Sequence, residues 1–218
     1  MYFLYRNTRI RLAGDSKDDA QNAELVRRWL ILALLNGVFS GSSDTMLHKI
    51  RDVLKKHGEH GRPFPIRELD EAAKEGKRIP TSDPVAIDNI LRLRIGDPAA
   101  FLALSLLFDE RGWGKMTKHQ DHIFPRDLFK QELRSFRDDR DSLGNLTLLL
   151  ARENEEKNRT PFDEWIQTRE PAFLQRHLIP ADSKLWRVQA FPEFLEHRTR
   201  LIRERLQSVL GIQGSSSA

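Results

Sequence analysis

The chain of 218 residues contains no cysteine, so disulfide bonds and cysteine-ligated zinc are excluded. Its longest apolar run, Trp29 to Phe39, is interrupted by Asn36 and Gly37 and falls short of the roughly 20 residues that a membrane span needs. The N-terminus lacks the basic start and the long apolar stretch of a secretory signal. We therefore expect a cytoplasmic protein without a membrane partner.

The sequence also lacks a strong excess of either charge, because 36 basic and 32 acidic residues leave a formal net charge of +4. A mildly basic protein is compatible with a polyanionic partner but does not require one. Two segments are richer in basic residues: Arg126, Lys130, Arg134, Arg137 and Arg140, and then Arg198, Arg200, Arg203 and Arg205. Such runs are by themselves typical of solvated helix faces. Charge alone therefore assigns no partner.

The first half of the chain has the spacing of apolar residues that is typical of helices. Residues 18–39 show a helical period, and shorter segments with the same pattern follow as far as Phe108. Glycine and proline separate these segments. We therefore expect a helical subdomain over residues 1–112.

The pattern changes after this subdomain. Residues 119–125 form a short segment without helical spacing, and residues 146–150 form a short apolar run after a glycine-asparagine turn, so both are predicted strands. Residues 152–157 have helical composition. We expect a strand–strand–helix core over residues 113–168. The rest is assigned to C-terminal helices packing on the core, 169–211, and to a flexible tail, 212–218.

The polar residues of this core are the types that phosphodiester hydrolysis needs. A neutral imidazole, here His122, can take a proton from water near neutral pH. Oxygen ligands from Asp121 and Asn154 suit Mg²⁺ (or Mn²⁺), which can offset the charge that builds on the phosphate. Asn145 can orient the imidazole by a hydrogen bond, and Lys157 can contact a phosphate from the helix face of Asn154. The segment is therefore a candidate nuclease site.

Some of these assignments have alternatives. Asn158 competes with Asn154 for the metal, Asn145 is also a plausible turn residue, and Lys157 can form an ordinary helix ion pair. Arg126 and Lys130 follow the first strand, and His119 lies on it. The candidate DNA contacts are therefore Lys157, Arg126, Lys130 and His119.

Asp121 and His122 are neighbours, and neighbouring side chains of a regular strand point to opposite faces. They can share a site only if the strand bends or ends there. Pro125 follows shortly afterwards and favours an early end.

The core contains three sequence blocks in order, Asp121-His122-Ile123-Phe124-Pro125, Leu143-Gly144-Asn145-Leu146-Thr147-Leu148-Leu149 and Asn154-Glu155-Glu156-Lys157, and a fourth with Pro161, Phe162 and Trp165. Together they resemble an HNH (His-Me finger) nuclease. More narrowly, they resemble the C-terminal nuclease domain of GmrSD-type modification-dependent restriction proteins, as does the stretch 39–45. The resemblance covers roughly residues 20 to 170.

This resemblance implies a mainly α fold, with a helical shell around a small ββα-metal (HNH) core. It implies a general base at position 122, metal ligands at 121 and 154, and a base-orienting residue at 145. The implied function is a metal-dependent DNA endonuclease, the effector domain of an anti-phage restriction system. The chain lacks the cysteine pairs of zinc-bearing HNH members, so its core must be held by the surrounding helices.

Full-length members of that family carry an N-terminal nucleotide-binding and modification-sensing domain, which we expect to be missing here because Met1 is followed directly by Tyr-Phe-Leu-Tyr. The alternative functions are a non-catalytic DNA-binding or regulatory module with a decayed site, and a structural helical adaptor. The sequence leaves open the modification sensed, nicking or double-strand cleavage, the sequence preference, RNA as a substrate, and the oligomeric state.

Overall fold

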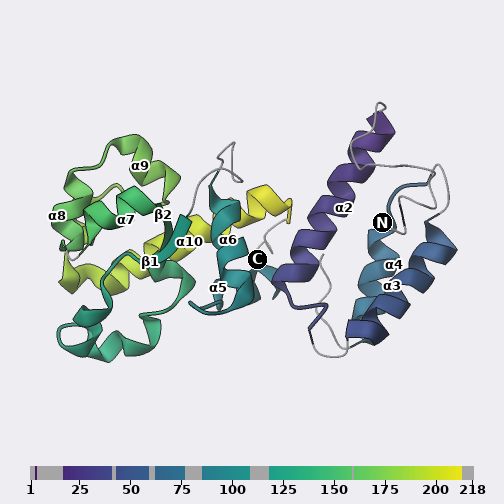
Figure 1. The fold of residues 1–218 in the computed structure, drawn as a ribbon, viewed down its shortest axis with the longest axis horizontal. Helices are drawn as coiled ribbons and strands as arrows, with labels where there is room; N and C mark the ends of the chain where they lie inside the picture. The colour runs from purple at the N-terminus through teal and green to yellow at the C-terminus, as the bar shows by residue number, and fades with distance from the viewer. Residues whose placement is uncertain are drawn as a thin grey trace, which may run out of the picture. The chain divides into compact units, whose positions relative to one another are not determined.

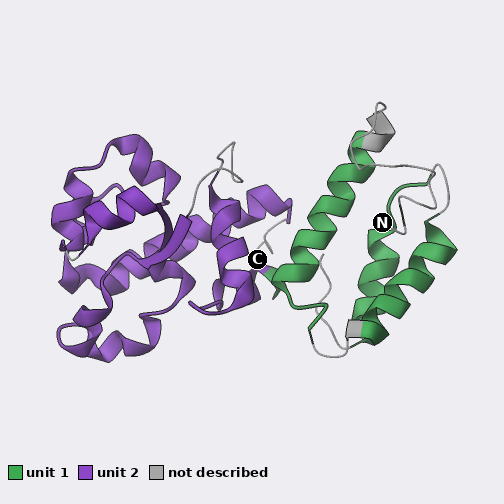
Figure 2. Cartoon of the chain, in the orientation of Figure 1, with its two compact units in different colours: residues 1–86 green, residues 87–218 purple. Residues whose placement is uncertain are grey.

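The computed structural model describes residues 3, 17–40, 43–58, 62–76, 85–108, 118–158 and 160–212. These residues are mainly helical and include a two-stranded sheet, as Figure 1 shows. They form two compact units, residues 1–86 and residues 87–218 (Figure 2), and each unit is described by itself. Within the described ranges, no helix has the length and apolar character that crossing a membrane requires. The mainly α fold class is confirmed.

The first unit is built from three longer helices, α2 (Lys17–Leu35), α3 (Ser43–His57) and α4 (Ile66–Glu75), and α3 packs against α4. The rings of Trp29 and Phe64 meet edge to face at its centre, with centroids 5.7 Å apart. The buried core contains Phe3, Trp29, Ala33, Val38, Met46, Ile50, Leu54, Phe64 and Leu69. The apolar period of the sequence thus corresponds to the buried helix faces.

Helix α2 ends at Leu35, earlier than the predicted end at residue 39. Gly37 has a φ of +62°, and its N–H donates to Leu34 while the N–H of Val38 donates to Ala33. This is the hydrogen-bond pattern of a Schellman cap, which favours glycine at the left-handed position. Gly37 therefore closes the helix although apolar residues continue beyond it.

The second unit contains the sheet. Its helices are α5 (Val85–Leu91), which spans the boundary between the units, α6 (Pro98–Leu107), α7 (Ala151–Lys157), α8 (Phe162–Gln167), α9 (Pro171–Arg176) and α10 (Phe191–Leu210). The strands are β1 (Lys118–His122) and β2 (Leu146–Leu150). Short 3-10 helices complete it: η1 (Arg126–Lys130), η2 (Arg134–Asp139), η3 (Leu143–Asn145), η4 (Ser183–Trp186) and η5 (Val188–Ala190).

The strands pair antiparallel, with Asp121 opposite Thr147 and His122 opposite Leu146. Helix α6 packs against β2 and α10. Helix α6 thus belongs to the same unit as the sheet. The compact units divide at residue 86, whereas the sequence predicted a helical subdomain that extends to residue 112. Residues 113–117 of the predicted core lie outside the described residues.

An aromatic cluster fixes the end of β1. Phe124 is fully buried two residues after His122, and its ring lies 4.8 Å from that of Phe162, 5.2 Å from that of Phe191 and 5.0 Å from that of Phe194. Edge-to-face and tilted contacts of this kind add to the free energy of apolar burial. The chain directly after His122 is therefore anchored by side chains from α8 and α10.

Helix α10 approaches η3 closely, because a Cβ atom on Gly144 would lie 2.5 Å from Leu195 Cδ1. From α10, the buried Arg198 guanidinium donates hydrogen bonds to the carbonyl oxygens of Leu143 (3.3 Å), Gly144 (2.6 Å) and His177 (3.2 Å). Burial lowers the pKa of Arg198 to about 9, so its guanidinium is still charged at neutral pH. A solvated helix face is therefore the wrong interpretation for Arg198.

The C-terminal end of the described chain is packed. Gly211 has a φ of +59° and ends α10, and Ile212 is buried with 6% of its surface exposed. Ile212 was predicted to begin a flexible tail, and its burial against the fold contradicts that prediction. Residues 213–218 of the predicted tail lie outside the described residues.

A second histidine is buried in this unit. His177 stacks on Phe173 at 3.9 Å, its Nδ1 lies 2.8 Å from Thr147 Oγ1, and Arg176 Nε donates to its Nε2. Because Nε2 accepts a hydrogen bond, the ring is neutral with its proton on Nδ1. Burial, followed by the charges of Arg176 and Arg198, lowers the pKa of His177 to about 2.

This burial predicts a pH-dependent stability. Unfolded His177 binds a proton below about pH 6.5, whereas the folded ring stays neutral down to about pH 2. The unfolded state therefore binds more protons in that window. The free energy of unfolding decreases as the pH is lowered, by about 2 kcal/mol between neutral pH and about pH 5. Urea unfolding at several pH values should show this loss in the parent chain and a smaller one in His177→Gln. Equal losses in the two proteins would contradict the prediction.

Candidate functional site

Asp121 and His122 share one pocket although they are neighbours on β1. The strand ends at His122, and Ile123 N donates to the backbone oxygen of Asn145 at 2.8 Å as the chain turns into the aromatic cluster. This is the early end that Pro125 favoured. Both side chains line a pocket of about 490 Å³, together with Lys157 and Asn158. Residues of the hairpin and of the end of α7 therefore face the same space.

The imidazole of His122 is buried and bonded at one nitrogen. The residue is 6% exposed, and its Nε2 lies 2.9 Å from Oδ1 of Asp141. Burial lowers the pKa of His122, and the hydrogen bond and charge of Asp141 oppose this effect only in part. The ring is therefore neutral at neutral pH, which is the state that a general base requires.

Asp141 is held as a carboxylate by its neighbour. Arg140 donates from Nε (3.0 Å) and Nη2 (2.5 Å) to the same oxygen, Oδ2 of Asp141, and these hydrogen bonds are charge-assisted. These hydrogen bonds, together with the one from His122, lower the pKa of Asp141 to about 2. Asp141 was not among the residues predicted from the sequence, and Arg140 was predicted only as part of a basic run. An arginine beside an aspartate in the loop between the strands is the one signal available from the sequence.

Lys157 is an interior cation. It is 3% exposed, and its Nζ donates to Oδ2 of Asp121 and, at 2.6 Å, to the backbone oxygen of His122. The ring of Trp165 lies 5.8 Å from Nζ. The ammonium group thus ties the last turn of α7 to the end of β1. The predicted contact with a phosphate would have to be made from inside the pocket.

Asn145 is fully buried, and its amide is bonded to the backbone. Oδ1 accepts a hydrogen bond from Phe124 N at 2.9 Å, and Nδ2 donates to the oxygens of Phe124 (3.3 Å) and Arg140 (2.8 Å). Both amide hydrogens are therefore used on carbonyl groups. In place of the expected hydrogen bond to the imidazole, Asn145 joins the end of β1 to the loop that carries Asp141.

The two asparagines proposed as alternative metal ligands have different positions. Asn158 is exposed, lines the pocket and follows α7 with a φ of +40°. Asn154 is half-buried on α7 and does not line that pocket. Asparagine tolerates the left-handed region better than most residues. The structure therefore places Asn158 in the lining of the pocket that also contains Asp121, and leaves Asn154 outside that lining.

The donor atoms of the pocket limit the kind of metal ion that fits. Within the described residues, no three or more His, Asp or Glu side chains form a group that could hold a metal. The pocket offers the Asp121 carboxylate, whose Oδ2 pairs with Lys157, and the amide of Asn158; it is also lined by the exposed acids Asp127, which pairs with Lys130, and Glu132. These oxygens fit an ion such as Mg²⁺, which retains several waters and is bound through one or two protein groups and a phosphate. They do not fit an ion enclosed by protein ligands alone.

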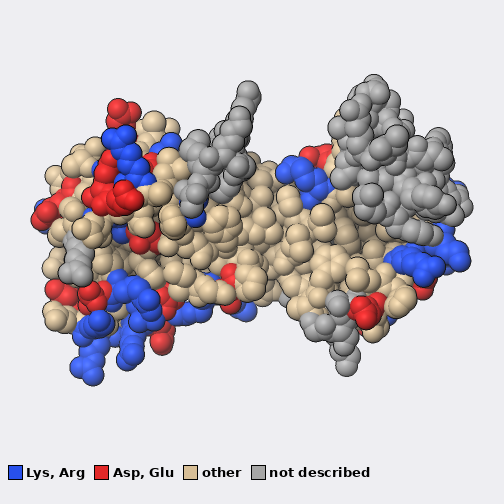
Figure 3. All heavy atoms as spheres, viewed as in Figure 1, with Lys and Arg blue, Asp and Glu red and all other residues tan. Residues whose placement is uncertain are grey.

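The three other predicted DNA contacts lie on the surface. Arg126 is exposed and lines the pocket, and Lys130 is exposed and pairs with Asp127 at 2.8 Å. His119 is exposed on β1 and is not part of the pocket lining. Figure 3 shows basic and acidic side chains side by side around η1 and η2, where the exposed arginines are Arg126, Arg134 and Arg137. Only Arg126 of these surface candidates belongs to the pocket.

The chain was also compared with known proteins. No family model matches it, and no curated protein gives a significant match. A function for this chain is therefore inferred from the pocket and from the sequence blocks around it.

Proposed function

We propose that the chain is a metal-dependent DNA endonuclease with a ββα-metal core of the HNH type, formed by β1, β2 and α7. The supporting observation is the state of His122, a buried neutral imidazole bonded through Nε2 to Asp141, in the pocket that also contains Asp121. A histidine with only a structural role would not need to face a pocket that is also lined by a carboxylate and an arginine. The resemblance of four sequence blocks to HNH nucleases supports the same proposal.

The residues have separate roles in this reaction. His122 carries its proton on Nε2, towards Asp141, so Nδ1 is the basic atom that accepts a proton from water. Lys157 holds the Asp121 carboxylate and the end of β1 in place. A divalent cation held by Asp121 and Asn158, with Asn154 as the alternative, would supply positive charge next to the phosphate.

The proposed substrate is double-stranded DNA, whose phosphates would be met first by the exposed Arg126 at the pocket and by Lys130 next to it. Such contacts give affinity without a choice of bases. By its resemblance to the restriction family, the chain would act as the effector of an anti-phage system, under the control of an N-terminal sensing domain.

Incubation of the whole chain with supercoiled plasmid tests the proposal, in separate reactions with Mg²⁺, Mn²⁺ and EDTA. We expect nicked or linear plasmid with either metal and none with EDTA. Plasmid binding that weakens steeply with salt, without cleavage in any metal, would support the non-catalytic DNA-binding module instead. Cleavage of RNA but not of plasmid would overturn the assignment of the substrate. If the chain neither bound nor cut plasmid, the structural helical adaptor would be the remaining alternative.

A further inference from the structure

The connection between Asp141 and His122 is not part of the HNH sequence blocks, yet it is the only hydrogen bond to the His122 ring among the described residues. We propose that Asp141 is the positioning residue that sets the tautomer and the orientation of His122, through its hydrogen bond to Nε2. The catalytic part of this inference rests on the proposed nuclease function. The structural part, the choice of tautomer, can be measured without cleavage.

The carboxylate of Asp141 is held from several sides. Its Oδ1 lies 2.9 Å from His122 Nε2, while Arg140 occupies Oδ2. The backbone on either side is also bonded: Asp141 O accepts a hydrogen bond from Ile95 N at 2.9 Å, and Arg140 O accepts one from Asn145 Nδ2 at 2.8 Å. Because the segment is fixed independently of the imidazole, the carboxylate can impose its geometry on the ring.

This fixed acceptor has two consequences for His122. A carboxylate can only accept, so the proton must reside on Nε2 in the neutral ring, and Nδ1 keeps its lone pair for water. When Nδ1 takes a proton, the ring becomes a cation, and the adjacent carboxylate stabilises it, as the aspartate does in a serine protease triad. Arg140 contributes indirectly, because an ionised Asp141 is required for both effects.

Three variants test the inference: Asp141→Ala removes the acceptor, Asp141→Asn keeps its shape without the charge, and Asp138→Asn is a matched control. Asp138 is an exposed acid in the same loop. The ¹⁵N NMR shifts of the imidazoles are recorded at neutral pH without metal, and the His122 signals are identified by their loss in His122→Ala. In the parent chain and in Asp138→Asn we expect a protonated Nε2 and an unprotonated Nδ1. In Asp141→Ala we expect averaged shifts from a mixture of both tautomers.

Cleavage rates give the second measurement. We expect kcat to fall about a hundredfold in Asp141→Ala and Asp141→Asn, with KM for DNA nearly unchanged, because proton transfer and not DNA binding is impaired. An unchanged tautomer in Asp141→Ala would overturn the inference even if the chain is an active nuclease. An altered tautomer in a chain that cuts nothing would support the positioning role and refute the nuclease.

Discussion

Replacement of His122 by alanine should reduce the rate of plasmid nicking by about 10³-fold or more, since general base catalysis typically contributes about 10²–10⁴-fold. Within the pocket lining, His122 is the only histidine, and burial lowers its pKa from the ordinary value, so the ring is neutral and able to accept a proton at neutral pH. The alanine variant leaves Asp121, Lys157 and the surface arginines in place. The rate of loss of supercoiled plasmid in saturating Mg²⁺ measures the effect.

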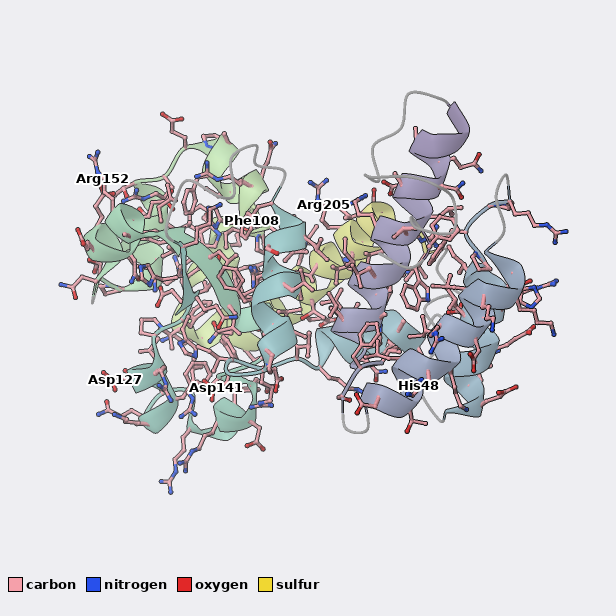
Figure 4. The ribbon with its side chains drawn as sticks, turned by 45° about the vertical axis from the view of Figure 1, so that its right-hand side comes forward. His48, Phe108, Asp127, Asp141, Arg152 and Arg205 are labelled. Carbon is pink, nitrogen blue, oxygen red and sulfur yellow. The ribbon has the colours of Figure 1, made fainter. Side chains whose placement is uncertain are left out.

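The controls separate catalysis from folding and from contamination by other nucleases. His48→Ala is a matched substitution, because His48 is exposed on α3 (Figure 4), and its rate should equal that of the parent chain. Far-UV circular dichroism and plasmid binding should be nearly unchanged in His122→Ala. If pure His122→Ala cut plasmid at the parent rate, His122 would not be the base. If the variant failed to bind DNA or to fold, the loss of cleavage would have another cause, and the assignment would be withdrawn.

The parts of the site that the sequence predicted are those encoded locally. Strand β2 covers the predicted residues 146–150, and α7 ends at the predicted Lys157. Short apolar runs beside a glycine turn, and a charged segment with good helix formers, determine such elements through their own residues. The shared pocket of Asp121 and His122 followed from the same local reasoning, because Pro125 indicated an early strand end.

The partner of His122 was missed because no local rule connects it to the ring. Asp141 lies in the connection between the strands, where η1, η2 and η3 carry no regular apolar period. Its contact with His122 depends on the path of this whole connection, which tertiary hydrogen bonds such as Ile95 N to Asp141 O determine. The sequence assigned the orienting role to Asn145, whose amide instead bonds the backbone of Phe124 and Arg140, and the orienting role that we propose falls to Asp141.

Charge was misleading at two positions for a related reason. Lysine and arginine are almost never fully buried unless they are paired, so the sequence indicated a solvated helix face for Arg198, and a phosphate contact or an ordinary helix ion pair for Lys157. Lys157 is paired with a carboxylate and a carbonyl oxygen. Arg198 donates to three carbonyl oxygens, two of them in η3. The tertiary fold determines which buried carbonyl oxygens lack a backbone donor, and no local sequence pattern indicates them.

Arg198→Leu should lower the free energy of unfolding by about 3–5 kcal/mol, because three buried carbonyl oxygens lose their donor at once. The substitution leaves the carbonyl oxygens of Leu143, Gly144 and His177 buried without their donor, and each lost partner costs about 1–3 kcal/mol before relaxation. Urea unfolding at neutral pH measures the change. Arg200→Leu, at an exposed position of the same helix, should change the free energy by less than about 0.5 kcal/mol.

The same substitution also reaches the proposed site, because two of the three carbonyls that Arg198 bonds, those of Leu143 and Gly144, directly precede Asn145, which joins β1 to the Asp141 loop. We therefore expect Arg198→Leu to cut plasmid more slowly than its folded fraction predicts, at a temperature where the variant is mostly folded. An Arg198→Lys variant, which retains the charge but has only one nitrogen to share among three oxygens, should lie between the two proteins in both stability and rate. A stability loss within about 0.5 kcal/mol for Arg198→Leu would mean that α10 and η3 are held by their apolar contacts alone. A normal rate per folded molecule would mean that the catalytic geometry does not depend on η3.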